Sequence, residues 1–177
     1  MRRPIRTALK IAAALVLFVA AAFAGLFLYG PEQAWQRLAG SADLGPVDLA
    51  TLARRPSPND ALLCSNSICP AAIADLQAGL YLIPAAELAE VLDRELAGET
   101  GLQRVDDGSD PLYRRFVQRS ALMRFPDTID VRVVPLTEDQ STLAIYSRAQ
   151  LGFADFGVNL ARIRRWSAHA DRLPEDD

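Results

Sequence analysis

The N-terminal segment constrains this chain more than any other feature. Ile11 to Tyr29 is a run of nineteen residues without a charged side chain, and four basic residues precede it: Arg2, Arg3, Arg6 and Lys10. An α-helix rises 1.5 Å per residue, so this run would cover about 28 Å, close to the hydrocarbon thickness of a bilayer. The sequence therefore predicts a single transmembrane anchor over residues 1–30, followed by a more polar domain.

The position of the basic residues predicts the orientation of this anchor. Basic residues flanking a membrane helix are retained on the cytoplasmic side. The four N-terminal charges all precede the apolar run, and the first acidic residue, Glu32, follows it. We therefore expect a single-pass protein of a bacterial inner membrane, with a cytoplasmic N-terminus and a periplasmic domain.

A cleavable signal peptide is the alternative. Ala22-Phe23-Ala24 matches the small-x-small pattern of a cleavage site. Cleavage near Ala24 would leave an apolar new terminus, Gly25 to Tyr29, and the uncut run exceeds the usual apolar core of a signal peptide. We favour a retained anchor over a secreted protein, and both alternatives export the same domain.

The charge of the remaining chain excludes one class of partner. After residue 10 there are 15 basic and 22 acidic side chains, which gives a net charge of −7. Nucleic-acid binding depends on neutralising phosphates with basic side chains. We therefore expect no nucleic-acid partner.

Two cysteines, Cys64 and Cys69, lie close together in the sequence. Nearby cysteines in an exported protein most often form a disulfide. Free thiols are the alternative. A zinc site would need further ligands, and the one histidine, His169, is far away in the sequence. The sequence predicts a structural disulfide and neither a metal nor a cofactor.

Composition suggests where the exported part begins and ends. Residues 31–57 contain three prolines and two glycines and are predicted to be a juxtamembrane linker. The compact domain is predicted over residues 58–172, and residues 173–177 form an acidic tail.

Hydrophobic periodicity predicts the elements of this domain. Short apolar or alternating runs indicate strands at 79–83, 102–105, 112–125, 128–134 and 142–148. A helix is expected from Pro84 to about residue 97, and a second from Asp155 with Phe156, Leu160 and Ile163 on its less polar face. The order β-α-β-β-β-β-α predicts an α+β fold in which a small antiparallel sheet packs on two helices.

Three motifs in the second half of the chain carry a family resemblance. They are 118–127 (QRSALMRFPD), 146–152 (YSRAQLG) and 155–162 (DFGVNLAR), and Pro58-Asn59-Asp60 precedes the cysteine pair. Together they resemble the bacterial and plastid family called domain of unknown function 1499, over roughly residues 56–166. Phe153 and Ala154 depart from the family, which often has His or Gln and then Ser there. The resemblance implies a fold and an envelope location, and no established activity.

Arginines on alternate strand positions form one candidate binding surface. Arg132 and Arg148 point away from the apolar face in the predicted register, with Arg119 beside them and Tyr146 and Asp130 on the same face. A row of guanidinium groups can hold a carboxylate or phosphate through paired hydrogen bonds. The alternative is a solvated face with cross-strand ion pairs, which is ordinary for exposed strands.

A second candidate lies on the last helix. Asp155, Asn159, Arg162 and Trp166 follow a helical spacing that places them on one stripe. A ligand or partner could dock there, on the loop and first turn from Gly152 to Asn159. The alternatives are that Asp155 caps the helix and that Asn159 and Arg162 fix the helix to the sheet.

Catalytic signatures are thin. No Gly-x-Ser-x-Gly elbow, phosphate loop or dinucleotide fingerprint occurs in the chain. We favour a non-catalytic binding or interaction module that takes a small ligand or an envelope protein. The alternatives are a hydrolase-like enzyme using Asp155 with Tyr146 or Ser147, for which Asp127 and Asp155 are a conceivable acid/base pair, and a purely structural domain.

Overall fold

The structure is a computed structural model that describes residues 2–170, and its chain divides into two compact units between Gly40 and Ser41. The acidic tail expected at 173–177 lies outside the described residues. The N-terminal unit contains helices α1 (Arg2–Tyr29) and α2 (Pro31–Ala39). Within α1, Thr7–Tyr29 has a mean hydropathy of 2.7, and this stretch is long and apolar enough to cross a membrane. It therefore has the properties of a membrane anchor or a signal peptide.

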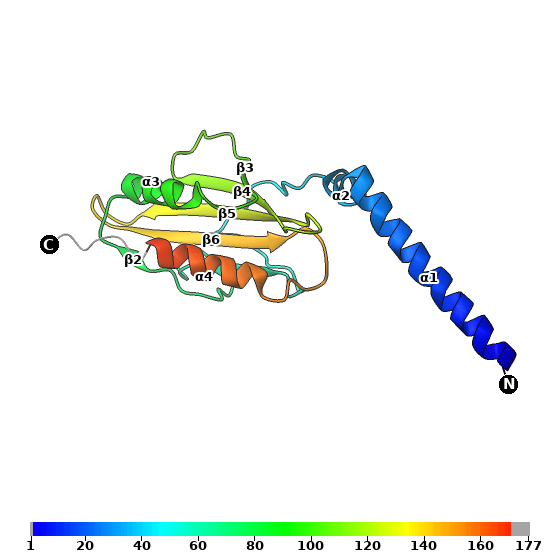
Figure 1. Ribbon diagram of the computed structural model, residues 1–177. Helices are drawn as coiled ribbons and strands as arrows, with labels where there is room; N and C mark the ends of the chain where they lie inside the picture. Colours follow the sequence, from blue (N-terminus) through cyan, green and yellow to red (C-terminus); the bar gives the residue numbers. More distant parts are fainter. Residues whose placement is uncertain (1, 171–177) are drawn as a thin grey trace. The chain divides into compact units, whose positions relative to one another are not determined.

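The second unit is built on an antiparallel sheet (Figure 1). Its strands are β1 (Asp60–Leu63), β2 (Leu80–Tyr81), β3 (Leu102–Arg104), β4 (Tyr113–Arg119), β5 (Pro126–Pro135) and β6 (Ser141–Ala149). They follow the order β1-β6-β5-β4-β3, with β2 also pairing with β6. Two helices, α3 (Ala85–Leu96) and α4 (Val158–Ala170), complete the unit. The α+β fold with an antiparallel sheet and two helices is thus confirmed.

One face of the sheet packs on both helices. Alternation along β5 and β6 turns Ile129, Val131, Leu143 and Ile145 to this face, where all four are buried. Leu88 and Leu92 of α3 and Ile163 and Trp166 of α4 complete the same core. Burial of these side chains from water holds the two helices against the sheet.

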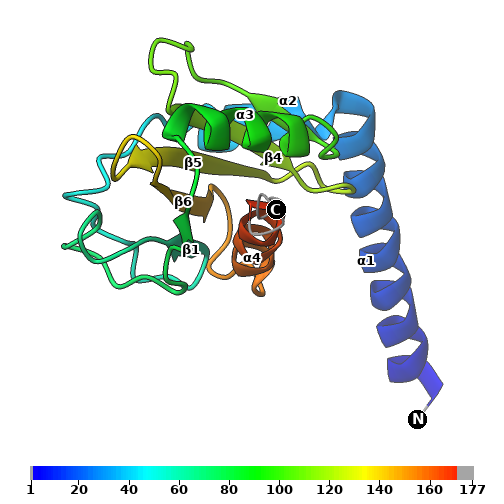
Figure 2. The same ribbon diagram turned by 90° about the vertical axis from the view of Figure 1, so that its left-hand side faces the viewer.

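The opposite face of the sheet is covered by chain segments without helices. Leu49 and Leu52, from the stretch expected to be linker, are buried with Leu62, Ala144 and Tyr146 of the sheet. Cys64 and Cys69 join this second core and form the predicted disulfide. Figure 2 shows the cyan and blue-green segments before β2 across the strands from α4. Residues 41–57 are named the covering segment below.

Two local expectations differ from the structure. Strand β1 was not predicted, because its residues Ala61, Leu62 and Leu63 are buried on both faces and show no alternation. Phe156 was expected on the less polar face of the last helix, and it is 98% exposed. The helix begins only at Val158, because Phe156 and Gly157 adopt left-handed backbone angles that interrupt the helical phase.

The loop between β3 and β4 yields a prediction on pH. Burial acts to raise the pKa of Asp106, but hydrogen bonds from Arg104 and from the Arg115 and Gly108 N–H groups lower it to about 2. A carboxylate with a folded-state pKa below its unfolded value stabilises the fold above the unfolded pKa and loses this contribution as pH falls. We expect Asp106→Asn to lower the free energy of unfolding by about 1–2 kcal/mol at pH 7 and by much less near pH 2.

Chemical denaturation of the wild type and Asp106→Asn across pH 2–7 measures this effect. Asp139→Asn, in the exposed turn before β6, is the matched control and should change the unfolding free energy little at either pH. A loss in Asp106→Asn that stays equal from pH 7 to pH 2 would contradict this assignment.

Candidate functional site

The arginines predicted to form one binding surface are separated in the structure. Arg132 lies opposite Tyr113 on β4, whereas Arg119 lies opposite Pro126 at the other end of β5. Arg132 donates to Asp110 at 2.8 Å and stacks over the Tyr113 ring. Arg119 donates to Gln103 at 3.4 Å. These two side chains therefore have different partners and lie apart along β5.

Arg148 and Tyr146 lie beneath the covering segment. Arg148 donates to the Gly45 carbonyl at 2.6 Å, lies over the Tyr146 ring, and has a nitrogen 3.5 Å from Asp130. Tyr146 is 2% exposed and donates its hydroxyl to Asp60 at 2.8 Å. Both side chains are engaged inside the domain, and neither forms the exposed face that alternation alone suggested.

Asp130 lies at the centre of the buried polar layer that Arg148 and Tyr146 form beneath the covering segment. Its carboxylate accepts a hydrogen bond from the Tyr113 hydroxyl, and Arg115 next to Tyr113 binds Asp43 of the covering segment. Burial raises the pKa of Asp130, although Tyr113 and the charges of Arg148 and Arg115 act in the opposite direction. Burial and hydrogen bonding to Asp130 also raise the pKa of Tyr113. The layer therefore joins the covering segment to the sheet through ionic and hydrogen-bonded contacts.

The predicted stripe on the last helix forms a second buried network. Arg162, 5% exposed, donates to Gln118 at 2.6 Å, to Ser147 at 2.7 Å and to Asp127 at 2.7 Å, and also to Asn159. Burial raises the pKa of Asp127, and the charge and hydrogen bond of Arg162 oppose that shift. This network ties α4 to strands β4, β5 and β6.

Asn159 carries this network to the start of β1. Its side-chain amide donates to the Asn59 carbonyl at 3.2 Å, and the Asn59 amide donates to the Gly152 carbonyl at 2.8 Å. Asp155 lies before the helix and accepts from the N–H groups of Gly157 at 2.9 Å and Asn159 at 2.8 Å. Asp155 thus caps α4, and these two backbone N–H groups fix the position of its carboxylate.

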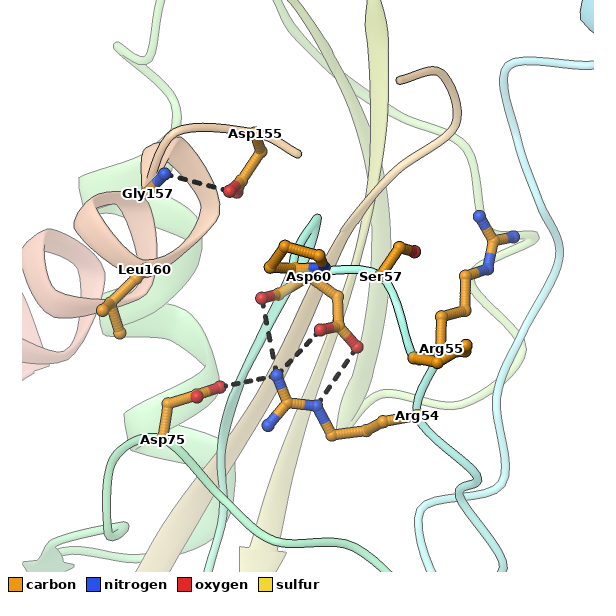
Figure 3. Close-up of a pocket in the computed structure, with 10 residues that line it drawn as sticks. Arg54, Arg55, Ser57, Asp60, Asp75, Asp155, Gly157 and Leu160 are labelled. Carbon is orange, nitrogen blue, oxygen red and sulfur yellow. Dashed lines mark hydrogen bonds and ion pairs between the residues drawn. The ribbon is translucent and has the colours of Figure 1, made fainter. Parts of the chain in front are cut away.

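An open pocket of about 390 Å³ lies beside Asp155, between the start of β1 and the start of α4. Figure 3 shows Asp155 on one side of it and a cluster of Arg54, Asp60 and Asp75 on the other. Arg55, Ser57, Gly157 and Leu160 also line the pocket. It is therefore formed by residues from three separate parts of the sequence, 54–60, 75 and 155–160, brought together by β1 and α4.

The charges in the pocket are already partly paired. The Arg54 guanidinium binds Asp60 at 2.7 Å and Asp75 at 2.9 Å, and donates to the Ile73 carbonyl at 2.7 Å. Asp75 also accepts from the Leu62 N–H at 2.8 Å. Three carboxylates and two guanidinium groups line the pocket, which leaves one negative charge in excess. A carboxylate has four lone-pair sites, so Asp75 and Asp155 keep acceptor capacity for a ligand.

Ser147 and Tyr146, the side chains considered as catalytic partners of Asp155, project from opposite faces of β6. The Ser147 hydroxyl is fully buried and bonds Asn159 and Arg162, so a substrate in the pocket does not reach it. Tyr146 projects from the other face of the same strand, and burial and the Asp60 hydrogen bond raise its pKa, which favours the protonated phenol. Within the described residues, no group of three His, Cys, Asp or Glu side chains is arranged to hold a metal ion.

Sequence reasoning identified Asp155 but missed Arg54, Asp60 and Asp75 as pocket residues. These three are separated by up to 21 positions and follow neither a helical nor a strand period. The one sequence feature that includes any of these three residues is Pro58-Asn59-Asp60, and it was used only as part of the family resemblance.

Comparisons with known proteins give one family. A family model described as "Protein of unknown function (DUF1499)" matches residues 70–169, more than half of the chain. No curated protein matches. Among solved structures, the ZhuI aromatase/cyclase from Streptomyces sp. R1128 is 15% identical, covering 53% of this chain and 85% of its own, with a TM-score of 0.33. A likeness this distant carries no argument about this chain.

Proposed function

This chain belongs to the DUF1499 family, and we propose that it is a membrane-anchored binding protein whose pocket takes a small ligand carrying positive charge or several hydrogen-bond donors. In this proposal, α1 is retained as the single anchor in a bacterial inner membrane, with the N-terminus in the cytoplasm. The sheet domain then lies in the periplasm, where its disulfide is stable.

The observation that carries the ligand class is the fixed pair of carboxylates at the pocket. Asp155 is held by the N–H groups of Gly157 and Asn159, and Asp75 by the N–H group of Leu62. Neither carboxylate needs to reorganise when a ligand arrives, which lowers the entropic cost of binding. The excess negative charge of the pocket, within a domain of net charge −7, favours cations over anions.

The pocket's size also fits a small molecule. A volume of about 390 Å³ lies in the range of small-ligand sites. Of the two arginines that line the pocket, Arg54 is paired with Asp60 and Asp75, and Arg55 donates to the Ala149 carbonyl at 3.4 Å. Arg148 and Arg162 are engaged outside the pocket, with the Gly45 carbonyl and with Asp127. An anionic ligand is therefore a poorer fit than a cationic one.

Calorimetric titration of the full chain in detergent micelles tests this function. Ethanolamine, which has an ammonium and a hydroxyl group, is the probe, and acetate is the anionic comparison. We expect ethanolamine to bind and acetate not to bind. Asp75→Asn should weaken ethanolamine binding about tenfold, since it removes one charge-assisted hydrogen bond.

Asp139→Asn is the matched control, because it removes one carboxylate from an exposed turn outside the pocket. Thermal melts of each variant establish that Asp75→Asn still folds. Binding of acetate in place of ethanolamine, or equal ethanolamine binding by both variants and wild type, would refute the proposed ligand class.

A further inference from the structure

Large apolar side chains gather on the loops at one end of the sheet domain. Phe156 is 98% exposed and Phe153 77% exposed in the loop before α4, and Val158 begins that helix half-exposed. Leu122, 70% exposed, lies in the turn between β4 and β5. These four residues are named the apolar tip. Exposed apolar groups that cluster in this way mark interaction surfaces more often than single exposed leucines do.

Strand pairing places the two loops of the apolar tip at the same end of the sheet. Arg119, the last residue of β4, pairs with Pro126, the first of β5, and Asp127 pairs with Ala149 at the end of β6. The Gln150 N–H then donates to the Pro126 carbonyl at 3.1 Å. The turn 120–125 and the loop 150–157 therefore leave neighbouring strands side by side, as Figure 1 shows for these strand ends.

The domain's first residues lie at this same end. The Thr128 hydroxyl donates to the Ala42 carbonyl at 2.9 Å, and the Gln150 side chain donates to the Ser41 carbonyl. Only Gly30 to Gly40 separate Ser41 from the end of α1, and nine of these residues form α2. Whatever the angle between the two units, this connection spans at most about 25 Å. With α1 retained in a bilayer as proposed above, a connection this short keeps the entry end of the domain close to that bilayer.

Phe156 is held outward at a cost to the fold. Its φ is 55°, in the left-handed region that a bulky residue rarely adopts. With 98% of its surface exposed, it gains almost no burial inside the domain in return. The hydrogen bonds from Gly157 and Asn159 to Asp155 fix the backbone on its C-terminal side. A strained and exposed aromatic side chain of this kind indicates a contact outside the chain.

We propose that the apolar tip inserts into the interfacial region of the bilayer in which α1 is anchored, as a second membrane contact. This inference rests on the proposed retention of α1 and not on the ligand pocket. The contact is apolar and not ionic, because a domain of net charge −7 gains nothing from anionic lipid. The tether raises the effective concentration of the bilayer near the tip, so a few side chains suffice.

The opposite end of the sheet provides an internal comparison. Leu82 and Leu136 are also exposed there, 72% and 51%. Strand β5 has ten residues and spans about 33 Å, which places that end well away from the entry of the chain. The proposal therefore predicts membrane contact at Phe156 and none at Leu136, although both side chains are apolar and exposed.

Site-specific fluorescence in reconstituted membranes tests this inference. The native cysteines are joined in a disulfide, so Phe156→Cys in the full chain accepts a single nitrobenzoxadiazole label. The labelled protein is reconstituted into phosphatidylcholine vesicles with or without nitroxide-bearing lipids. We expect these lipids to reduce the emission at position 156 by about twofold or more, at low and high salt alike. Labelled Leu136→Cys should keep its emission.

Two further variants keep the test decisive. Phe153→Cys provides a second label on the apolar tip and should be quenched as position 156 is. Phe156→Asn suits the left-handed backbone, so its melting temperature should be unchanged or raised while the label at position 153 loses part of its quenching.

Unquenched labels at 153 and 156, or equal quenching at 136, would overturn the proposal. Protection from an aqueous quencher in native membranes, without quenching in pure lipid, would identify a protein partner and equally overturn it. Ligand binding is not read by these labels, so either proposal can fail alone.

Discussion

Arg162→Ala is expected to lower the free energy of unfolding by about 3–5 kcal/mol, the largest loss among the substitutions considered. Arg162 donates to Asp127, Gln118, Ser147 and Asn159 from a position that is 5% exposed. Its removal leaves the Asp127 carboxylate buried without a cation, and it also leaves a cavity between α4 and the sheet. Chemical denaturation of the full chain in micelles measures this loss.

The pH dependence of this loss identifies its cause. Burial already raises the pKa of Asp127 above its unfolded value, and removing Arg162 should raise it further. The penalty for the charged form is then fully present at pH 7 and disappears as pH falls below the unfolded value, near 4. We therefore expect a smaller loss at pH 4 than at pH 7. Arg165→Ala on the same helix, where Arg165 is 48% exposed and pairs with Glu99, should cost less than about 1 kcal/mol. Equal losses in the two variants would contradict this account.

Arg148→Ala is expected to lower the unfolding free energy by about 2–4 kcal/mol. Arg148 holds the Gly45 carbonyl of the covering segment at 2.6 Å and is the cation near the buried Asp130 carboxylate. Its loss should expose the covering segment, so amide hydrogen exchange at 44–52 should speed up along with the fall in stability. Thermal melts and hydrogen exchange of the full chain measure the two effects.

Arg132→Ala is the matched control for Arg148→Ala. Arg132 lies on the same face of the sheet but its pair with Asp110 is about 40% exposed on both sides, so the loss should stay below about 1 kcal/mol. Asp130→Asn in the Arg148→Ala background should recover part of the stability, because it removes the unpaired charge. Stability of Arg148→Ala equal to that of the wild type would mean that Arg148 does not hold the covering segment.

The sheet and its two helices were predictable because their periodicity is local. Alternation at Ile129, Val131 and Val133 and the spacing of Leu88, Leu92 and Leu96 encode which face is buried. The covering segment was not recognised, because its prolines and glycines are typical of a linker and only Leu49 and Leu52 mark its contact with the sheet. Its burial depends on Ala144 and Tyr146, about 90 residues further along the chain.

The candidate site was predictable only where its residues lie close together in sequence. The spacing of Asp155, Asn159 and Arg162 indicated a common stripe, and the structure connects them through one network. The alternation on β5 and β6 placed Arg132 and Arg148 on one face correctly, but it contains no information about what covers that face. The pocket joins Asp75 to Asp155 across 80 positions, and no local pattern records such a contact.

Two-dimensional NMR of the full chain in micelles, titrated with ethanolamine, tests the ligand pocket most directly. The backbone amides of Gly157 and Asn159 report on the Asp155 carboxylate, and the amide of Leu62 reports on Asp75. We predict that these three signals shift together and saturate, whereas Val133, whose amide bonds Leu112 away from the pocket, does not move. Signals at Gly157, Asn159 and Leu62 that stay fixed while ethanolamine binds elsewhere, or that respond only to acetate, would contradict the proposed site.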